Sequence, residues 1–411
     1  MAVHETPSPD SLFQIAPFVR FWIARICTAA ANQMLSVAVA WQIYQLTGSA
    51  MDLGLVGLFQ FLPRVFLTAT AGNMADSHDR KRIATLAQVV QATVLTALLL
   101  LTLAHAIDRQ WIFALVAVSG AARTFEMPAT SSLLSTLVPS RLLTKAVALN
   151  ASAIQAAFIV GPALAGLLYA LGDAVVHGIT LILFVAAAAA FASIPSAREE
   201  RPAIAGSEWQ KFVDGLRFIR GQRVVLGAIS LDLFAVLFGG ATALMPILAV
   251  ELLHTGPWGL GLLRSAPSVG ALLMSAVLAR VPLEHHVGRI MFASVAVYAA
   301  ATVGFGLSTS LWLSLALLAV LGAADMISMV IRGSLVQLQT PDHMRGRVSA
   351  VNSIFIGASN QLGEFESGVT AAWFGAAPAV ILGGVCSLAV TALWMRWFPQ
   401  LLSADRLAGR R

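Results

Sequence analysis

The sequence predicts an all-α polytopic membrane protein whose twelve transmembrane helices form two pseudo-symmetric halves of six. Three observations lead to this fold class. The 411 residues are 58% hydrophobic and only 11% charged, which a water-soluble domain of this size would not tolerate on its surface. Twelve apolar runs are long enough to cross the hydrocarbon core, which needs about 20 helical residues. Finally, residues 120–150 are repeated without a gap at residues 322–352.

Turn residues and short charged segments separate the predicted spans. The spans are expected at residues 18–44, 53–71, 83–104, 111–138, 146–170, 175–194, 224–250, 259–279, 288–307, 311–340, 347–370 and 377–398. The loops after even-numbered spans and the C-terminal tail hold 19 Lys and Arg residues, whereas the odd loops hold only Arg109. Because positively charged loops stay in the cytoplasm, we expect a multi-pass plasma (inner) membrane protein with both termini cytoplasmic.

The net charge of +6 follows the same topology. It indicates attraction to anionic membrane lipids, and no nucleic acid partner is expected. Cys27 and Cys386 both lie in apolar runs, so we expect neither a disulfide nor a metal site.

The repeat sets the organisation of the chain. At an offset of 202 the repeated positions include Gly120/Gly322, Met127/Met329, Pro139/Pro341 and Asn150/Asn352. With six spans each, the halves have the same orientation in the membrane, and a ligand is expected between them near mid-bilayer. We expect an N-terminal half at residues 1–194, a cytoplasmic linker with an amphipathic helix at residues 195–222, and a C-terminal half with its tail at residues 223–411. The linker helix either lies on the membrane surface or serves as a tether.

A polar motif lies between spans 2 and 3. Residues 72–82 read GNMADSHDRKR, with a glycine, an aspartate four residues later and a closing basic cluster, namely Gly72, Asp76, Arg80, Lys81 and Arg82. This loop resembles the signature of the major facilitator superfamily. The glycine permits close helix approach, and the aspartate can face a helix N-terminus. The resemblance implies that Asp76 locks the cytoplasmic side against the start of span 11, near residues 345–347.

Span 5 carries Gly161, Pro162 and Gly166, which resemble the exporter motif of this superfamily. The glycines would allow tight packing and the proline would kink the helix; an ordinary packing face of small residues is the alternative. Residues 122–139, 148–166 and 342–368 resemble the branch that contains enterobactin exporters and related transmembrane secretion effectors. The resemblance implies the major facilitator fold and transport by alternating access.

Several charged residues fall inside the predicted spans, where each costs about 2.5 to 3.5 kcal/mol at the bilayer centre and should face a cavity or a partner. The candidates for proton coupling or for lining a cavity are Arg25, Arg123, Glu126, Asp232, Asp325, Arg332, Glu364 and Glu366. We expect Glu364 either to contact the substrate or to form hydrogen bonds with neighbouring polar groups.

The spacing of these charges predicts specific pairs. Arg123 and Glu126 are three residues apart on one helical face and can pair directly. Arg123 also aligns with Asp325 in the repeat, so the two are expected to face each other across the pseudo-twofold axis. In this hypothesis Asp325, or Glu126 competing for Arg123, binds a proton on one side and releases it on the other. The alternative is a permanent structural ion pair.

Two further relationships involve Asp232. Arg25 and Asp232 are approximate counterparts of opposite charge in the two halves, and Asp232 with Arg264 is an alternative packing pair.

The motifs exclude several functions. The sequence contains no P-loop, HExxH or GxSxG motif, so we expect no enzyme activity and no cofactor. The predicted function is secondary active transport: proton-coupled export of a siderophore-like or drug-like small molecule by a monomer in contact with membrane lipids and protons. Import by proton symport and flipping of a lipid-like molecule remain alternatives on the same fold, and an intramembrane enzyme is a remote one.

Overall fold

The computed structural model describes residues 11–195, 208–281, 283 and 285–405, and no β-strand occurs within these ranges. The elements are η1 (Leu12–Gln14), α1 (Ala16–Thr47), α2 (Ala50–Ser77), α3 (Arg80–Leu103), α4 (Arg109–Leu137), α5 (Ser140–Tyr169), α6 (Asp173–Ala192), α7 (Glu208–Gly221), α8 (Arg223–Phe238), η2 (Ala241–Leu244), α9 (Met245–Ile247), η3 (Leu248–Leu252), α10 (Pro257–Leu278), α11 (Val287–Leu307), α12 (Leu311–Gln339), α13 (Asp342–Phe374), α14 (Ala376–Trp397) and α15 (Pro399–Leu402).

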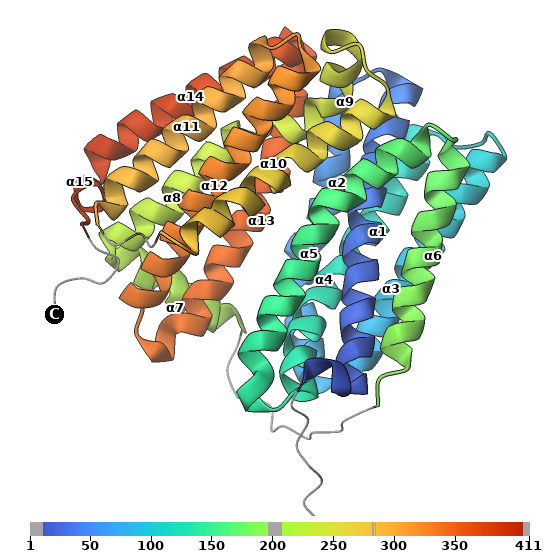
Figure 1. Cartoon of the computed structure of the whole chain (residues 1–411), viewed down its shortest axis with the longest axis horizontal. Helices are drawn as coiled ribbons and strands as arrows, with labels where there is room; N and C mark the ends of the chain where they lie inside the picture. Colours follow the sequence, from blue (N-terminus) through green and yellow to red (C-terminus); the bar gives the residue numbers. More distant parts are fainter. Residues whose placement is uncertain (1–10, 196–207, 282, 284, 406–411) are drawn as a thin grey trace, which may run out of the picture.

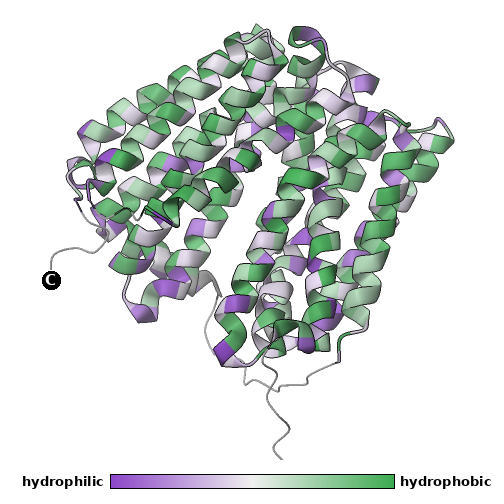
Figure 2. Cartoon of the chain, in the orientation of Figure 1, coloured by the Kyte–Doolittle hydropathy of each residue, from purple (hydrophilic) through white to green (hydrophobic). Residues whose placement is uncertain are grey.

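The predicted all-α polytopic fold is confirmed. Within the described ranges, 11 helical segments are long and apolar enough to cross a membrane, when α8 to η3 are taken as one segment. The helix expected for span 11, α13, has 33 residues but is less apolar than the others and is not in that set. Figure 2 shows hydrophobic residues along most of the helices and hydrophilic residues concentrated at the ends nearest α7.

The internal repeat is visible in the helix boundaries. Helices α4 and α12 each have 29 residues and begin 202 positions apart. Pro139 immediately precedes α5 and Pro341 immediately precedes α13, with φ angles of −59° and −58°. Proline fixes φ near this value and suits the start of a helix. The duplicated sequence therefore folds into duplicated structure.

The helices pack in two groups (Figure 1). In the first group, α1 contacts α5 and α6, α2 contacts α4, and α3 contacts α4 and α6. In the second group, α10 contacts α12, α11 contacts α12 and α14, and α8 contacts α13 and α14. The main contacts between the groups are α5 with α10 and α2 with α13. The residue limits given above for the two halves and the linker remain a prediction.

The two groups meet at the end of the molecule that carries the α1–α2 and α5–α6 turns, here called the distal side. There, a Cβ on Gly166 would lie 3.0 Å from Cα of Gly261, and a Cβ on Gly368 would lie 2.6 Å from Cα of Gly54. These glycines let two backbones touch where any side chain would separate them. Toward the end that carries α7, here called the linker side, the groups diverge (Figure 1).

The prediction of one continuous helix at residues 224–250 is wrong. Helix α8 ends at Phe238, and the chain continues through η2, α9 and the π-helical turn η3. The break follows Gly239 and Gly240, and a Cβ on Gly240 would lie 2.4 Å from the carbonyl oxygen of Gly363 on α13. The carbonyl of Gly239 accepts from the amide of Ala241 at 2.7 Å and from the hydroxyl of Tyr298 at 3.3 Å. A tight turn and a side chain together therefore satisfy this carbonyl where the helix ends.

The linker forms the predicted helix, α7, which packs on α13. A Cβ on Gly215 would lie 2.8 Å from the carbonyl oxygen of Arg347, and Ile219 is fully buried. Asp214 accepts a hydrogen bond from Arg347 at 3.2 Å. One face of α7 therefore packs against the protein and is not exposed to the surroundings.

Candidate transport cavity

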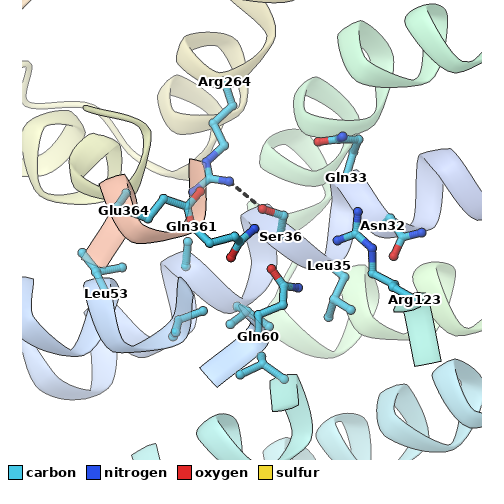
Figure 3. Close-up of a pocket in the computed structure, with 15 residues that line it drawn as sticks. Asn32, Gln33, Leu35, Ser36, Leu53, Gln60, Arg123, Arg264, Gln361 and Glu364 are labelled. Carbon is cyan, nitrogen blue, oxygen red and sulfur yellow. Dashed lines mark hydrogen bonds between the residues drawn. The ribbon is translucent and has the colours of Figure 1, made fainter. Parts of the chain in front are cut away.

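A polar cavity lies between the two groups of helices. Its volume is about 130 Å³ and its lining comes from α1, α2, α4, η2, α10 and α13. The polar lining residues are Asn32, Gln33, Ser36, Gln60, Arg123, Arg264, Gln361 and Glu364 (Figure 3). The cavity thus lies between the two halves, as the repeat predicts, and each half contributes charged side chains to its wall.

Arg264 is anchored to both helix groups. One terminal nitrogen of its guanidinium donates to the Ser36 hydroxyl on α1 at 2.6 Å. The other donates to the carbonyl of Thr242 at 3.4 Å, in the irregular segment after α8. The same carbonyl accepts from the amide of Met245, so a backbone oxygen of the irregular segment is shared between its own turn and a cavity arginine.

Glu364 enters the cavity from α13 opposite α2. A Cβ on Gly57 of α2 would lie 2.7 Å from Oε2 of Glu364, so the carboxylate occupies the space left by the absent side chain. Its charge acts on both Arg264 and Arg123. The sequence placed Glu364 near a substrate or among polar neighbours, and the structure brings it to the cavity wall.

Inside the first group, Glu126 pairs with Arg25. Nη1 of Arg25 lies 2.8 Å from Oε1 of Glu126 and 3.4 Å from the hydroxyl of Thr130. The prediction that Glu126 pairs with Arg123 is therefore wrong. Arg123 and Glu126 are three residues apart on α4 as predicted, but the Arg123 side chain points into the cavity. The partner of Glu126 is instead Arg25, which comes from α1.

Inside the second group, Arg332 on α12 pairs with Asp232 on α8. Their side chains are 5% and 6% exposed. This partner excludes the alternative pairing of Asp232 with Arg264. Arg25 and Asp232 are each paired within their own group, with opposite charges at corresponding helices.

Asp325 lines a second, smaller cavity with Asp232, Tyr298 and Ser328. Arg123 lines the cavity between the groups. The prediction that Arg123 and Asp325 face each other is therefore wrong for this structure. Their repeat-related positions are preserved, but Asp325 points into its own helix group, toward α8 and α11.

Glu366 differs from its neighbour Glu364. It accepts a hydrogen bond from Thr370 one turn later at 2.7 Å and does not line the central cavity. Its proposed part in proton coupling remains a prediction.

The loop motif between α2 and α3 is partly described. No atom lies within 4 Å of a Cβ placed on Gly72, so the predicted close helix approach there is wrong in this structure. Arg80 donates to the carbonyl of Ala75 at 3.3 Å. The carboxylate of Asp79 accepts from the backbone amide of Lys81 at 2.9 Å and lies 3.7 Å from the Arg82 guanidinium. The Asp76 side chain lies outside the described part, so its predicted latch is untested.

The span 5 motif lies on the face of α5 that contacts other helices. A Cβ on Gly161 would lie 2.7 Å from Cβ of Gln33 on α1, and Gly166 contacts α10 as described above. Pro162 is inside α5, and its carbonyl oxygen lies 2.5 Å from a Cβ placed on Gly261. The motif thus packs α5 against α1 in its own group and against α10 in the other group.

Sequence reasoning missed much of the cavity wall. Asn32, Gln33 and Ser36 share a face of α1, and Gln60 lies on α2. The sequence feature that indicates them is the occurrence of uncharged polar side chains at helical spacing within apolar spans, where they need a cavity or a polar partner as charges do.

Residues 8–408 match the transmembrane secretion effector family. The chain belongs to this family of major facilitator transporters. The match spans nearly the whole chain and agrees with the helical fold. The members of this family are multi-pass membrane transporters rather than enzymes, and the match confirms the resemblance inferred from the motifs.

Two curated relatives are efflux proteins. The multidrug efflux pump Tap of Mycolicibacterium fortuitum is 25% identical over 366 residues, covering 86% of this chain and 88% of the relative. Macrolide efflux protein A of Streptococcus pyogenes is 27% identical over 156 residues, and this match covers 38% of each protein. The second match therefore spans well under half of that relative.

Solved structures show the same fold at low identity. A bacterial homologue of ferroportin in an inward-facing state has a TM-score of 0.73 at 17% identity, covering 96% of this chain and 100% of that one. The D323A mutant of the nucleoside transporter NupG has a TM-score of 0.74 at 13% identity, covering 93% and 100%. These similarities establish the architecture and carry no information about substrate.

Proposed function

We propose that this protein exports a small organic molecule from the cell by alternating access, coupled to the entry of protons. The observation that carries the proposal is a charged cavity between two helix groups that touch at the distal side and diverge at the linker side. The names of the relatives, which are efflux pumps, support export over import.

The linker side is proposed to be cytoplasmic and the membrane to be the plasma membrane. The 19 Lys and Arg residues in the even loops and the tail support this orientation, because positively charged loops remain inside. In this orientation the structure corresponds to a state in which cargo enters from the cytoplasm.

Asp325 is the proposed proton-binding residue. Asp232, beside it in the same small cavity, has Arg332 as its partner, whereas no ion pair to Asp325 occurs among the described residues. An unpaired carboxylate in such surroundings is costly when charged. Binding a proton removes that cost, and its release on the other side would bias the two helix groups between states.

Proton flux into proteoliposomes tests the function. Purified protein is reconstituted with an internal pH-sensitive dye, and siderophores, antibiotics and lysolipids are added in turn. We expect at least one compound to drive proton movement opposite to its own. Movement of both in the same direction would replace export by symport, and a response to lysolipids alone would favour a flippase.

Asp325→Asn is the decisive variant. We expect it to abolish coupled proton movement, whereas Asp342→Asn, at a side chain that is 88% exposed on the linker side, should leave it intact. Unchanged coupling in Asp325→Asn would end the assignment, and no proton response to any compound would count against proton coupling itself.

A further inference from the structure

Two arginines reach the central cavity from opposite halves of the protein. Arg123 comes from α4 in the first half, and Arg264 comes from α10 in the second (Figure 3). Glu364 is the single carboxylate among the described residues that line the cavity, and no Lys, Asp or His joins them. The formal charge of the wall is therefore positive by one unit.

Neither arginine is neutralised by a direct ion pair. Within the described residues, no carboxylate oxygen lies within ion-pair distance of Arg123 or Arg264. A guanidinium carries five N–H donors, and Arg264 uses terminal nitrogens on Ser36 and Thr242 while its Nε remains without a partner. Both guanidinium groups therefore have hydrogen-bonding capacity left for a ligand.

Arg123 and Arg264 are partly buried, and a partly buried positive charge without a counter-ion is costly within a membrane-spanning helix. Glu364 lowers that cost because its charge acts on both arginines, but one carboxylate cannot compensate two cations. A cationic ligand would add a third positive charge to the cavity. A ligand carrying a carboxylate or phosphate group would instead supply the missing negative charge and accept the free N–H groups, a match that arginine makes bidentately.

The remaining wall has two characters. Leu35, Val39, Leu53, Val56 and Val116 give it an apolar portion. Near the charges, the side-chain oxygens of Asn32 and Gln361 are buried without partners. An apolar surface beside a few converging polar groups is typical of sites for small organic molecules.

We propose that the cavity binds an amphiphilic organic anion, and that Arg123 and Arg264 bind its charged group while the aliphatic wall receives its apolar body. Glu364 then competes with the ligand for the same two arginines. This inference rests on the transport function proposed above and names the class of its cargo.

Binding of two probes with the same ring and opposite charges tests the proposal. Purified full-length protein in maltoside micelles is dialysed to equilibrium against 2-naphthoate or 2-naphthylmethylammonium, with protein-free micelles as blank. We expect 2-naphthoate to bind at least about tenfold more tightly. Equal or tighter binding of the cation, or no binding of 2-naphthoate above the blank, would overturn the proposal.

Charge variants give effects of opposite sign. Arg264→Gln and Arg123→Gln should each weaken 2-naphthoate binding about tenfold, a difference of about 1.4 kcal/mol. Glu364→Gln should strengthen it, which a general folding defect could not do. Arg109→Gln, at an exposed arginine on the distal side, is the matched control and should bind like the unmodified protein. Equal affinities for Arg264→Gln and Arg109→Gln would also overturn the assignment.

A competition arm separates the two sources of such an anion. The concentration that displaces half of the bound 2-naphthoate is measured for lysophosphatidylglycerol and for 1-naphthoate. A lower value for lysophosphatidylglycerol would show that the anion is a lipid headgroup, and a lower value for 1-naphthoate would show that it is a soluble solute. Binding is measured without a gradient. Anion binding without any proton flux would therefore refute the proposed coupling and leave the cavity assignment standing.

Discussion

Arg25 on α1 donates to Glu126 on α4 across 2.8 Å, and Asp232 and Arg332 join the corresponding helices α8 and α12 with the charges exchanged. Each half thus connects its first and fourth spans through one ion pair. The exchange of sign indicates that the connection, rather than the position of either charge, is what both halves need. It also leaves Arg123 and Asp325 free for other roles.

Exchanging the charges of the first pair tests this interpretation. Glu126→Gln leaves a largely buried cation without its partner and should destabilise the protein by about 3 kcal/mol. The double variant Arg25→Glu with Glu126→Arg reproduces the polarity of the second half and should recover most of that loss. Thermal unfolding in detergent measures both, with Arg82→Gln, an arginine 87% exposed, as control. A double variant no more stable than the single one would contradict the prediction.

The two pairs should differ in their sensitivity to substitution. The side chains of Arg332 and Asp232 are 5% and 6% exposed, whereas those of Arg25 and Glu126 are 19% and 5% exposed. Asp232→Asn, which leaves the deeply buried Arg332 without its partner, should therefore cost about 3 to 5 kcal/mol, and Glu126→Gln less, because water reaches the remaining Arg25 more easily. Comparison of the two unfolding midpoints checks the order, and an equal or reversed order would show that exposure does not govern these pairs.

The sequence predicted the helices and the repeat because both depend on local pattern. Apolar runs of membrane-spanning length and an ungapped repeat gave α4 and α12 to within a few residues. Partner choice could not be predicted in the same way. The spacing of Arg123 and Glu126 allowed a pair on one helix, but the packing of α1 against α4 gave Glu126 a different partner.

The break in the seventh span shows the same limit. Gly239, Gly240 and Pro246 are visible as possible helix breakers in the sequence, yet the surrounding residues are almost continuously apolar. The close approach of Gly240 to Gly363 and of Phe238 to Gly383 is a tertiary feature that the sequence pattern does not show. The contact of Arg264 with the carbonyl of Thr242 in the irregular segment could not be predicted for the same reason.

The C-terminal end should detach from α11 in acid. The amide of His286 donates to Asp405 at 3.1 Å, and the amide of Gly288 donates to the carbonyl of Ala404 at 2.9 Å. The hydrogen bond from His286 holds the pKa of Asp405 below its usual range, with a smaller contribution from His285. The folded state therefore favours the ionised carboxyl, so this contact is fully present above the ordinary pKa of about 3.9 and is lost as pH falls through the lower folded value.

Hydrogen exchange at Gly288 measures that change. After correction for the intrinsic rate, protection of the amide should be constant from about pH 7 to 5 and should fall below about pH 4. Asp405→Asn should lack the transition, and global stability should hardly respond because the side chain is 59% exposed. Protection that persists unchanged at about pH 3 would show that the carboxylate does not hold the tail.

The distal contact should control which state the protein occupies. Gly166 and Gly261 touch at their backbones, so a valine at either position needs space that only separation of α5 from α10 provides. Gly166→Val should shift the protein toward a state open on the distal side, and Gly178→Val, where a Cβ meets no atom within 4 Å, should not. Spin labels at Asp173 and Trp258 would report the α5–α10 end. A distance distribution that remains unchanged in Gly166→Val, while Gly178→Val also matches the unmodified protein, would mean that this glycine contact does not hold the distal side closed.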